Sequence, residues 1–463
     1  MRFSDLFKSR DELNLLDGPI GRNLFFLSLP IVITNLLRTA YNLADTFWLG
    51  RVGEDALAAI TFAFPIVFLL ISAGIGLAVA GSVLVAQHEG KGHKKGAEYA
   101  ASQTVGFGLI VSLVLGILGY FVVGDIVSLL GARPAVAAMA TSYLQVVSLG
   151  LVFMFGFSIF IALMRGYGDT VTPMLLMLVT VIFNIILDPF FIFGWWIFPE
   201  LGITGAAIAT IACRAFATIA GLIILVTDLR GVKIHFHHVM PEFDFVKKIL
   251  RIGVPASVES MGTALSVNIM VAIVGLFANS VVAGFGIGIR IFSVVFLPAD
   301  AMSRGVEAMT GQNIGAKNFG RARTINIVAA KYTFLILLGI GAICFIWAEQ
   351  IIGVFSTNPS VIQPGAQFLR FVAPTFGFLA IIRAFMGGFR GVGKTIYAAA
   401  ISIAFVGVFR IPIAYIGAID YGPVGVWISF PVSIILGAIM ATVLFYWDNW
   451  DATLVDEEDS TAV

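Results

Sequence analysis

Long apolar stretches alternate with short polar ones along all 463 residues of the chain. A helix that crosses a bilayer takes about 20 mostly apolar residues. Backbone groups in lipid must be hydrogen-bonded within the spanning structure, so stretches of this length predict helices and not barrel strands of about ten residues. The pattern predicts an all-α integral membrane protein with twelve transmembrane helices, at 24–48, 57–86, 99–123, 136–164, 172–194, 203–226, 248–275, 282–310, 326–350, 361–388, 396–418 and 423–447.

The first six spans and the last six are two copies of one unit. A shift of 225 positions places equal residues on each other without an insertion. Because each copy has an even number of spans, both enter the membrane in the same direction. This parallel repeat predicts two six-helix lobes related by a pseudo-twofold axis along the membrane normal, with a cleft between them. The matched pairs include Pro30 and Pro255, Gly50 and Gly275, Ala58 and Ala283, Gln87 and Gln312, Gly90 and Gly315, Arg165 and Arg390, Gly166 and Gly391, Gly168 and Gly393, and Thr170 and Thr395.

Polar segments give the domain boundaries. The longest polar connection separates the two copies, and the chain ends in a strongly acidic stretch. We therefore expect a cytoplasmic N-terminal segment at 1–23, an N-lobe at 24–226, a cytoplasmic linker at 227–247, a C-lobe at 248–447 and an acidic cytoplasmic tail at 448–463.

Composition agrees with a membrane protein. Hydrophobic residues make up 59% of the chain and charged residues 12%, against about 25% charged residues in soluble domains. The mean hydropathy is +0.99. Cys213 and Cys344 lie in separate apolar stretches, which gives no disulfide or metal-binding spacing and predicts two buried small residues. The polar N-terminus does not resemble a cleavable signal peptide.

The distribution of Lys and Arg predicts the orientation. With the N-terminus inside, the outer loops hold only Arg51 and Arg133, and the positive-inside rule is satisfied for all twelve spans. We expect a multi-pass protein of the plasma membrane with both termini cytoplasmic. The basic residues of the inner segments are Arg2, Lys8, Arg10, Arg22, Lys91, Lys94, Lys95, Arg165, Arg230, Lys233, Lys247, Lys248, Arg251, Lys317, Arg321, Arg323, Lys331, Arg390 and Lys394.

Acids at helix centres occur in the first copy without counterparts in the second. A charged side chain at the centre of a spanning helix costs about 2.5–3.5 kcal/mol on insertion scales, so such residues usually serve ion or proton pathways. Residues that both copies share are expected to be structural, and polar residues that only one copy carries are candidates for function. The unmatched residues are Asp45, Asp188 and Asn184, which face Met270, Ile413 and Phe409.

The first span combines an acid with a helix breaker. Tyr41 precedes Asp45 by four residues and shares its helical face. Pro30 removes a backbone hydrogen bond deeper in the same span, so this helix can change shape when Asp45 changes charge. The alternative is an acid at the mouth of the helix, exposed to outer water.

The fifth span carries the second acid. Asn184 and Asp188 are four residues apart and point the same way, and Pro189 follows. Burial favours the protonated form of a carboxyl, which suits a proton carrier. Two carboxylates, an amide and a hydroxyl also form a set of hard oxygen ligands for Na⁺; Thr210 is the candidate hydroxyl and Thr204 the weaker choice. The alternative for Asn184 and Asp188 is a hydrogen-bonded pair between helices.

The second copy carries charges of secondary interest. Glu259 follows Pro255 by one helical turn, and Asp300 follows Pro298 within the eighth span. Both are second-rank candidates for the coupling site. Arg304 and Glu307 are three residues apart near the cytoplasmic end of that span, and we expect a structural ion pair.

Three motifs do not indicate the chemistry they resemble. Gly388-Phe-Arg-Gly-Val-Gly393-Lys394-Thr395 matches the P-loop pattern, but it joins two spans and its repeat counterpart has Asp169 in place of Lys394. Small residues such as Gly74, Gly76 and Gly81 favour close helix packing over a dinucleotide site. For His235, His237 and His238 we expect a solvated linker, with a metal site as the alternative.

The chain resembles the multidrug and toxic compound extrusion (MATE) family over its whole length. The residues that carry the resemblance are Tyr41-Asn-Leu-Ala-Asp45-Thr-Phe-Trp-Leu-Gly50-Arg51-Val-Gly53, Asp55-Ala-Leu-Ala-Ala59, Arg165-Gly-Tyr-Gly-Asp-Thr170 with Pro173, Leu187-Asp188-Pro189, Gly202-Ile-Thr-Gly205-Ala-Ala-Ile-Ala-Thr210 and Gly311-Gln-Asn-Ile-Gly315-Ala.

The resemblance implies a V of two six-helix lobes and efflux of organic, often cationic compounds against inward flow of Na⁺ or H⁺. The acid set is similar to the branch named for DNA-damage-inducible protein F (DinF), in which N-lobe acids bind the coupling ion. That implies cation coupling at Asp45, Asn184, Asp188 and Thr210, with Pro30 and Tyr41 on the bending first helix. Glu259 matches a C-lobe acid of the other main branch, but the tenth span here has no acid.

These observations predict an antiporter that exchanges an amphipathic drug-like compound for Na⁺ or H⁺. It would act as a monomer in membrane lipid, with no cofactor, nucleotide or nucleic acid. The alternative is a lipid-linked oligosaccharide flippase of the same superfamily, with a basic cavity built from Arg38, Arg290 and Arg410. A membrane-embedded enzyme would need a His/Asp or Cys/His cluster near one membrane surface, which the sequence lacks outside the central loop.

Overall fold

Every regular element in the computed structural model is helical within the part of the chain that it describes, namely residue 8, residues 10–450 and residues 454–455. The predicted acidic tail lies mostly outside the described residues, as does the start of the predicted N-terminal segment.

The first copy contains seven α-helices among its described residues. A short 3₁₀ helix, η2 (Arg10–Glu12), precedes them. The helices are α1 (Ile20–Leu49), α2 (Glu54–Gly90), α3 (Lys94–Leu129), α4 (Pro134–Leu149), α5 (Leu151–Tyr167), α6 (Val171–Phe193) and α7 (Gly202–Val226).

The second copy follows a linker that contains the 3₁₀ helix η3 (Phe236–His238). Its elements are α8 (Phe243–Val274), α9 (Asn279–Gly315), α10 (Phe319–Ile346), α11 (Ala348–Gly353), α12 (Pro359–Val372), the 3₁₀ turn η4 (Ala373–Thr375), α13 (Phe376–Val392), α14 (Thr395–Ser402), the π-helix η5 (Ile403–Phe409), α15 (Arg410–Tyr421) and α16 (Pro423–Trp447).

The predicted all-α membrane architecture is confirmed. In the described residues, eleven helical stretches are long and apolar enough to cross a membrane, and one bent pair gives up to twelve. Each predicted span corresponds to one of these. Several helices extend further than predicted, because their polar ends continue as helix beyond the apolar centre.

The fourth predicted span is bent and not a single straight helix. α4 and α5 meet at Gly150 with an angle of 53° between them. The side chain of Ile211 on α7 lies where a β-carbon at position 150 would be, so a glycine allows this close approach.

The eleventh predicted span, at 396–418, contains a π-helical segment. The hydroxyl of Ser266 on α8 donates to the carbonyl of Val406 at 2.6 Å, which supplies a donor from outside the helix. Pro412 has no N–H to donate to the carbonyl of Val408. Both features disturb the α-helical hydrogen-bond ladder, and π-helical turns often mark functional positions.

The internal repeat is visible in matched hydrogen bonds. α5 and α13 end at Gly168 and Gly393, which have φ of 104° and 88° and occupy the left-handed region. The N–H of Gly168 donates to the carbonyl of Arg165, and the N–H of Gly393 to that of Arg390, at 2.9 and 2.8 Å. Both copies therefore end this helix with the same left-handed cap.

The same cap explains the P-loop match without a nucleotide. The motif begins inside α13 and runs past its end, whereas a P-loop follows a buried strand. Lys394 is engaged elsewhere, because its Nζ donates to Asp448 Oδ2 at 2.7 Å and to the carbonyl of Asn449 at 2.6 Å.

The described chain forms two compact units. The first comprises the described residues 8, 10–14, 29–257 and 454–455, and the second comprises residues 15–28 and 258–450. The beginning of α1 thus belongs with the C-terminal helices, and the beginning of α8 with the N-terminal helices.

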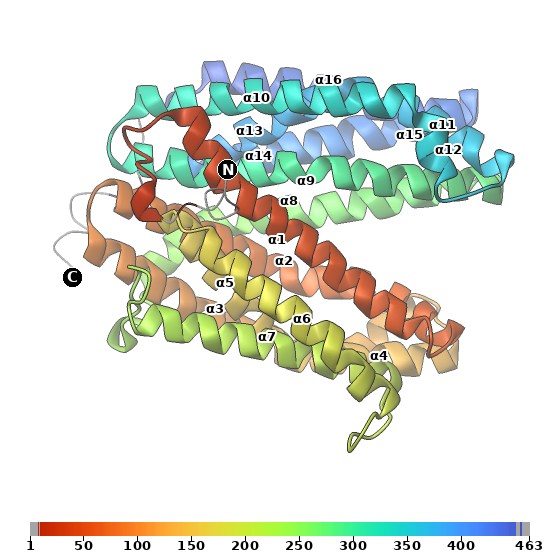
Figure 1. The fold of residues 1–463 in the computed structure, drawn as a ribbon, viewed down its shortest axis with the longest axis horizontal. Coiled ribbons are helices and arrows are strands. Elements are labelled where there is room, and N and C mark those ends of the chain that lie inside the picture. Colours follow the sequence, from red (N-terminus) through yellow and green to blue (C-terminus); the bar gives the residue numbers. More distant parts are fainter. Residues whose placement is uncertain (1–7, 9, 451–453, 456–463) are drawn as a thin grey trace. The chain divides into compact units, whose positions relative to one another are not determined.

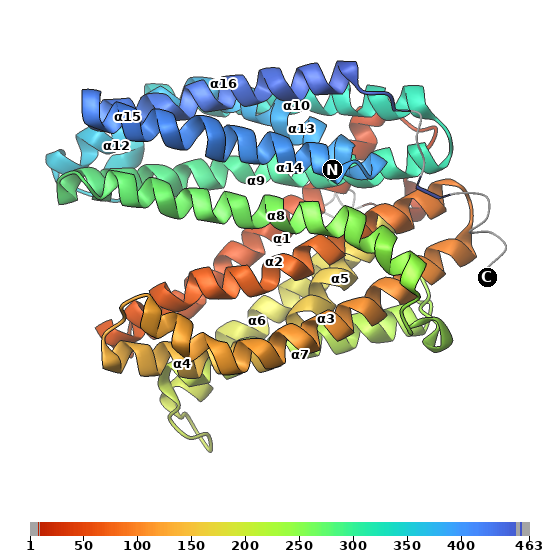
Figure 2. The same cartoon turned by 180° about the vertical axis from the view of Figure 1, so that it is seen from behind.

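Each unit is a bundle of closely packed helices. In the first unit α2 packs against α3 and α5, and α6 packs along α7 (Figure 1). In the second, α13 packs against α9 and α10, and α15 lies alongside α16 (Figure 2).

The expectation that glycines allow close helix packing is confirmed at Gly76. A β-carbon on this α2 residue would collide with the carbonyl of Gly253 and the hydroxyl of Ser257 on α8. Small residues let helices approach to backbone contact in this way.

The segment that follows α7 is partly solvated, since His237 is exposed, and other parts of it pack on α3. The side-chain amide of Gln103 donates to the carbonyls of His238 and Met240 at 2.7 and 2.9 Å and accepts from the N–H of Glu242 at 2.8 Å. His235 Nε2 lies 2.9 Å from Glu98 Oε2. The three histidines form no metal-binding cluster with other described His, Cys, Asp or Glu residues.

Candidate functional site

Three helices of the first unit each contribute a pair of polar residues spaced four apart. α1 carries Tyr41 and Asp45, α6 carries Asn184 and Asp188, and α7 carries Thr210 and Arg214. Residues at this spacing share a helical face. Asn184 and Asp188 are fully buried, Tyr41 and Thr210 are nearly so, and Asp45 and Arg214 are half-buried.

The structure brings the four predicted coupling residues together. Asp45 lies close enough to Asp188, Asn184 and Thr210 for direct side-chain interaction. The Asn184 amide donates to Asp188 Oδ1 at 2.8 Å, so this hydrogen bond lies within α6 and not between helices. The phenol of Tyr41 lies beside Thr210.

Several oxygens of this cluster remain without a hydrogen bond of ordinary length and angle. All are buried, and a buried polar atom without a partner is costly. A proton shared by the carboxylates would satisfy the two carboxylate oxygens, and a small cation is a partner for all of these oxygen types. These atoms are Tyr41 OH, Asp45 Oδ1, Asn184 Oδ1, Asp188 Oδ2 and Thr210 Oγ1.

The donor set suits a small hard cation or a proton. It consists of carboxylate, amide and hydroxyl oxygens, and such oxygens are the ligands that hard metal ions prefer. Pro189 follows Asp188 inside α6 and has no N–H, so the carbonyl of Ile185 lacks its helical donor. Pro30 lies in the interior of α1, which remains helical through it.

Arg214 is a member of this site that sequence reasoning missed. Its guanidinium carbon lies 4.8 Å from the ring centre of Tyr41 and 5.5 Å from that of Phe157, and its Nη1 lies 3.9 Å from the Met177 sulfur. It is also within electrostatic reach of Asp45. The sequence contains two signals for it: Arg214 lies four residues after Thr210, and its counterpart in the second copy is the apolar Ile439.

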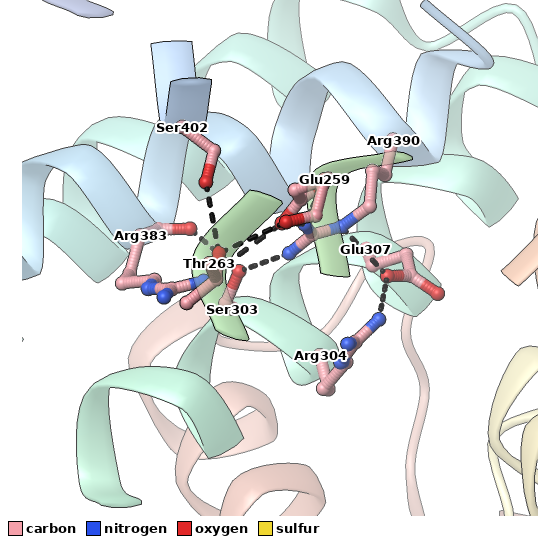
Figure 3. A network of polar contacts seen from close by, with 8 residues as sticks. All are labelled: Glu259, Thr263, Ser303, Arg304, Glu307, Arg383, Arg390 and Ser402. Carbon is pink, nitrogen blue, oxygen red and sulfur yellow. Dashed lines mark hydrogen bonds and ion pairs between the residues drawn. The ribbon is translucent and has the colours of Figure 1, made fainter. Parts of the chain in front are cut away.

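The second unit holds a buried ion network across α8, α9 and α13 (Figure 3). Arg390 is its centre: Nη1 donates to both carboxylate oxygens of Glu259 at 2.8 and 3.0 Å, and Nε donates to Glu307 Oε2 at 3.2 Å. Arg390 Nη2 donates to the hydroxyl of Ser303 at 2.8 Å. The predicted pair of Arg304 and Glu307 is confirmed at 3.2 Å, within this network.

The second-rank candidates therefore lie among arginines. Glu259 is paired with Arg390 and has Arg383 Nη1 at 3.9 Å. Asp300 lies within electrostatic reach of Arg304 and Arg383. In this network three acids face three arginines, so its charges balance. The first-unit site has two acids and one arginine, and is short of one positive charge.

Arg410 is a buried cation without an acidic partner among the described residues. Its Nε donates to the Ser433 hydroxyl at 3.0 Å, and its guanidinium carbon lies 4.4 Å from the ring centre of Phe430. Nη2 is buried and has no hydrogen bond. Arg290 is exposed.

A duplicated bundle of apolar helices with a buried, unbalanced carboxylate pair defines a membrane transporter and not an enzyme. The family comparison agrees. The MatE family model matches residues 30–190 and 255–416, so its two matches begin 225 residues apart at Pro30 and Pro255. The chain belongs to the MATE family of multidrug efflux transporters.

Named relatives are similar over almost the full chain. The probable multidrug resistance protein YoeA of Bacillus subtilis is 27% identical over 91% of this chain and 92% of its own length. The FAD transporter of Shewanella oneidensis is 29% identical over 93% of this chain and 95% of its own.

Solved structures share the twelve-helix fold. Crystal structures of MATE in the straight and in the bent conformation each match with a TM-score of 0.88 and 25% identity, and cover 95% of this chain and 98% of theirs.

Proposed function

We propose that this protein is a secondary active antiporter of the DinF-like branch, which exports organic, often cationic and amphipathic drug-like compounds in exchange for Na⁺ or H⁺. The observation that carries the proposal is the N-lobe cluster of Asp45, Asn184, Asp188 and Thr210, in which two carboxylates meet among buried oxygens. Like charges at this separation are stable only with a proton or cation between them.

In the proposed cycle, the coupling cation enters from outside and neutralises Asp45 and Asp188. The charge change acts on α1, which carries Asp45 and, half a helix away, Pro30. Bending at Pro30 moves Tyr41 and contracts the space open to substrate, which leaves outward. Crystal structures of MATE in a straight and in a bent conformation support a change of shape in this cycle. One charge crossing 100 mV supplies about 2.3 kcal/mol for the exchange.

The test is ethidium transport into inside-out proteoliposomes under two separate driving forces, a Na⁺ gradient at equal pH and a pH gradient without Na⁺. The wild-type protein should concentrate dye under at least one gradient. D45N and D188N should each lower gradient-driven accumulation at least about tenfold, because an amide cannot exchange charge.

D125N is the matched control, because Asp125 is an exposed acid on α3 far in sequence from the cluster. It should accumulate dye like the wild type. Unimpaired gradient-dependent transport by D45N and D188N would refute the coupling assignment, and the gradient that drives the wild type identifies the ion.

An anionic cargo is a second candidate. Arg410 is a buried cation without an acidic partner among the described residues, and a relative at 29% identity is an FAD transporter. Adding FAD in place of ethidium to the same vesicles distinguishes an anionic from a cationic substrate. Accumulation of FAD but not of ethidium would favour the anionic substrate and contradict the cationic one.

We place the protein in the plasma membrane as a monomer with both termini cytoplasmic. The distribution of Lys and Arg between inner and outer loops supports this orientation.

A further inference from the structure

The side chain of Arg214 is held beside the carboxylate pair without joining it. Two aromatic rings, Tyr41 and Phe157, and the Met177 sulfur surround its guanidinium, and it forms no ion pair with any described carboxylate. Tyr41 is one helical turn from Asp45, so the charge lies one side chain away from the site. Cation–π contacts hold a guanidinium without neutralising it.

The remaining groups around the site do not change its charge at neutral pH. Besides Arg214, the titratable side chains that the described residues place within reach of Asp45 or Asp188 are Tyr41 on α1, Tyr143 on α4 and Cys213 on α7. Phenols and thiols are neutral near pH 7 unless their environment favours the anion, and this site is already negative. The ionised site therefore has two negative charges and one positive charge.

We propose that Arg214 is the resident counter-ion of the carboxylate pair, and that it fixes the coupling stoichiometry at one monovalent cation or one proton per cycle. This inference rests on the proposed function and specifies how its site is charged. One arriving charge neutralises the cluster when Arg214 is present, whereas two are required when it is absent.

The stacked position of Arg214 explains why the coupling cation can still bind. A guanidinium bonded directly to both carboxylates would occupy the oxygens that the cation needs, as Arg390 does with Glu259. Held on the rings of Tyr41 and Phe157, it lowers the negative potential but leaves the oxygens open. It therefore weakens cation binding without preventing it, which allows release on the cytoplasmic side.

The test measures the number of cations bound, with the purified full-length protein in lipid nanodiscs. Radioactive ²²Na⁺ binding and proton release to a pH indicator are recorded together, so that either ion is counted. The wild type should bind one monovalent equivalent per chain. R214Q should bind two, with a tighter first site, because the site has lost its positive charge. R214K keeps the charge and should bind one.

R133Q controls for the loss of an arginine, because Arg133 is an exposed residue paired with Asp55 at the surface. It should bind one equivalent. Thermal unfolding of each variant shows whether R214Q is folded. If it is not, R214K is the variant to measure, since binding of two monovalent equivalents by R214K would contradict a role for the charge. A stoichiometry and affinity of R214Q equal to those of the wild type would overturn the proposal.

The same measurement separates this inference from the proposed function. If D45N and D188N bind cations like the wild type, the coupling site itself is wrong. If they lose binding while R214Q binds like the wild type, the coupling site stands and the counter-ion role of Arg214 fails.

Discussion

A buried carboxylate in a membrane helix needs compensation, and the two units supply it differently. Glu259 is held in a two-pronged ion pair by Arg390. Asp45 and Asp188 face each other, and neither has an ion pair within the described part of the chain; the charge of Arg214, stacked on Tyr41, lies nearby. A carboxylate that is already paired with an arginine is neutralised and has little affinity for a cation, whereas a carboxylate without an ion pair can bind one. This difference supports our proposal that the coupling site lies in the first copy.

Acidification should loosen the linker through His238. Burial, and then the neighbouring charges of His237 and His235, lower the pKa of His238 below its ordinary value. The docked linker disfavours protonation, so its stability is complete above the ordinary histidine pKa of about 6.5 and declines as pH falls below it. Hydrogen exchange of residues 232–242, corrected for intrinsic rates, should rise on going from pH 8 to pH 5.5.

H238N should flatten that pH dependence, while H93N, a loop variant beside α3, should retain it. Equal pH dependence in H238N and the wild type would remove His238 as the cause.

The residues of the coupling site differed in how well the sequence predicted them. Asp45, Asn184 and Asp188 stood out because charged or amide groups in apolar spans had apolar repeat counterparts. Arg214 meets the same criterion, since Ile439 is its counterpart, but a basic residue in a membrane protein also fits the pattern that sets membrane orientation. The partner of Glu259 could not be predicted, because the pairing with Arg390 depends on tertiary contacts between residues 131 positions apart.

At the scale of elements, Arg390 joins three helices by its side chain alone. It lies on α13 and bonds Glu259 on α8 and Glu307 and Ser303 on α9 (Figure 3). R390Q would remove the two-pronged partner of the buried Glu259 carboxylate and one of the two arginines that pair with Glu307. Breaking a buried ion pair on one side destabilises by about 3–5 kcal/mol, so thermal unfolding in detergent should occur at a markedly lower temperature.

The double variant R390Q/E259Q should recover part of this loss, because one uncompensated charge is removed. E349Q is the control, since Glu349 and Arg370 form an exposed pair at 3.0 Å, and such pairs contribute about 1 kcal/mol or less. An R390Q protein as stable as E349Q would show that the network contributes little to stability.

Element boundaries were less predictable than element number. Hydropathy identifies a span by its apolar length, and all twelve were found in this way. It does not identify the bend at Gly150 or the π-helix at Ile403–Phe409, because both depend on side chains from other helices, Ile211 and Ser266. The contact of the linker with α3 was not predictable for a similar reason: its polar composition gives no sign of the hydrogen bonds that Gln103 forms with its backbone.

For the whole molecule, the orientation in the membrane is directly testable. Cys213 and Cys344 are buried, so the unmodified protein should react little with thiol reagents. Lys95, at the start of α3, and Glu200, in the loop before α7, are exposed and are predicted to lie on opposite sides of the membrane. On intact cells, E200C should react with a membrane-impermeant maleimide and K95C should not.

Permeabilised cells supply the control, because both variants should then react. Labelling of K95C but not E200C on intact cells would invert the topology and place both termini outside.

The composition of the two compact units bears on the origin of the protein. Residues 15–28, from the first copy, complete the second unit, and the beginning of α8, from the second copy, completes the first. A half-length chain would lack a segment of its own bundle and would have to borrow it from another molecule. Such reciprocal exchange is what a swapped homodimer provides. A gene fusion of two such subunits would preserve the exchanged segments. Each half could then diverge, one towards the proposed ion binding and the other towards a structural role.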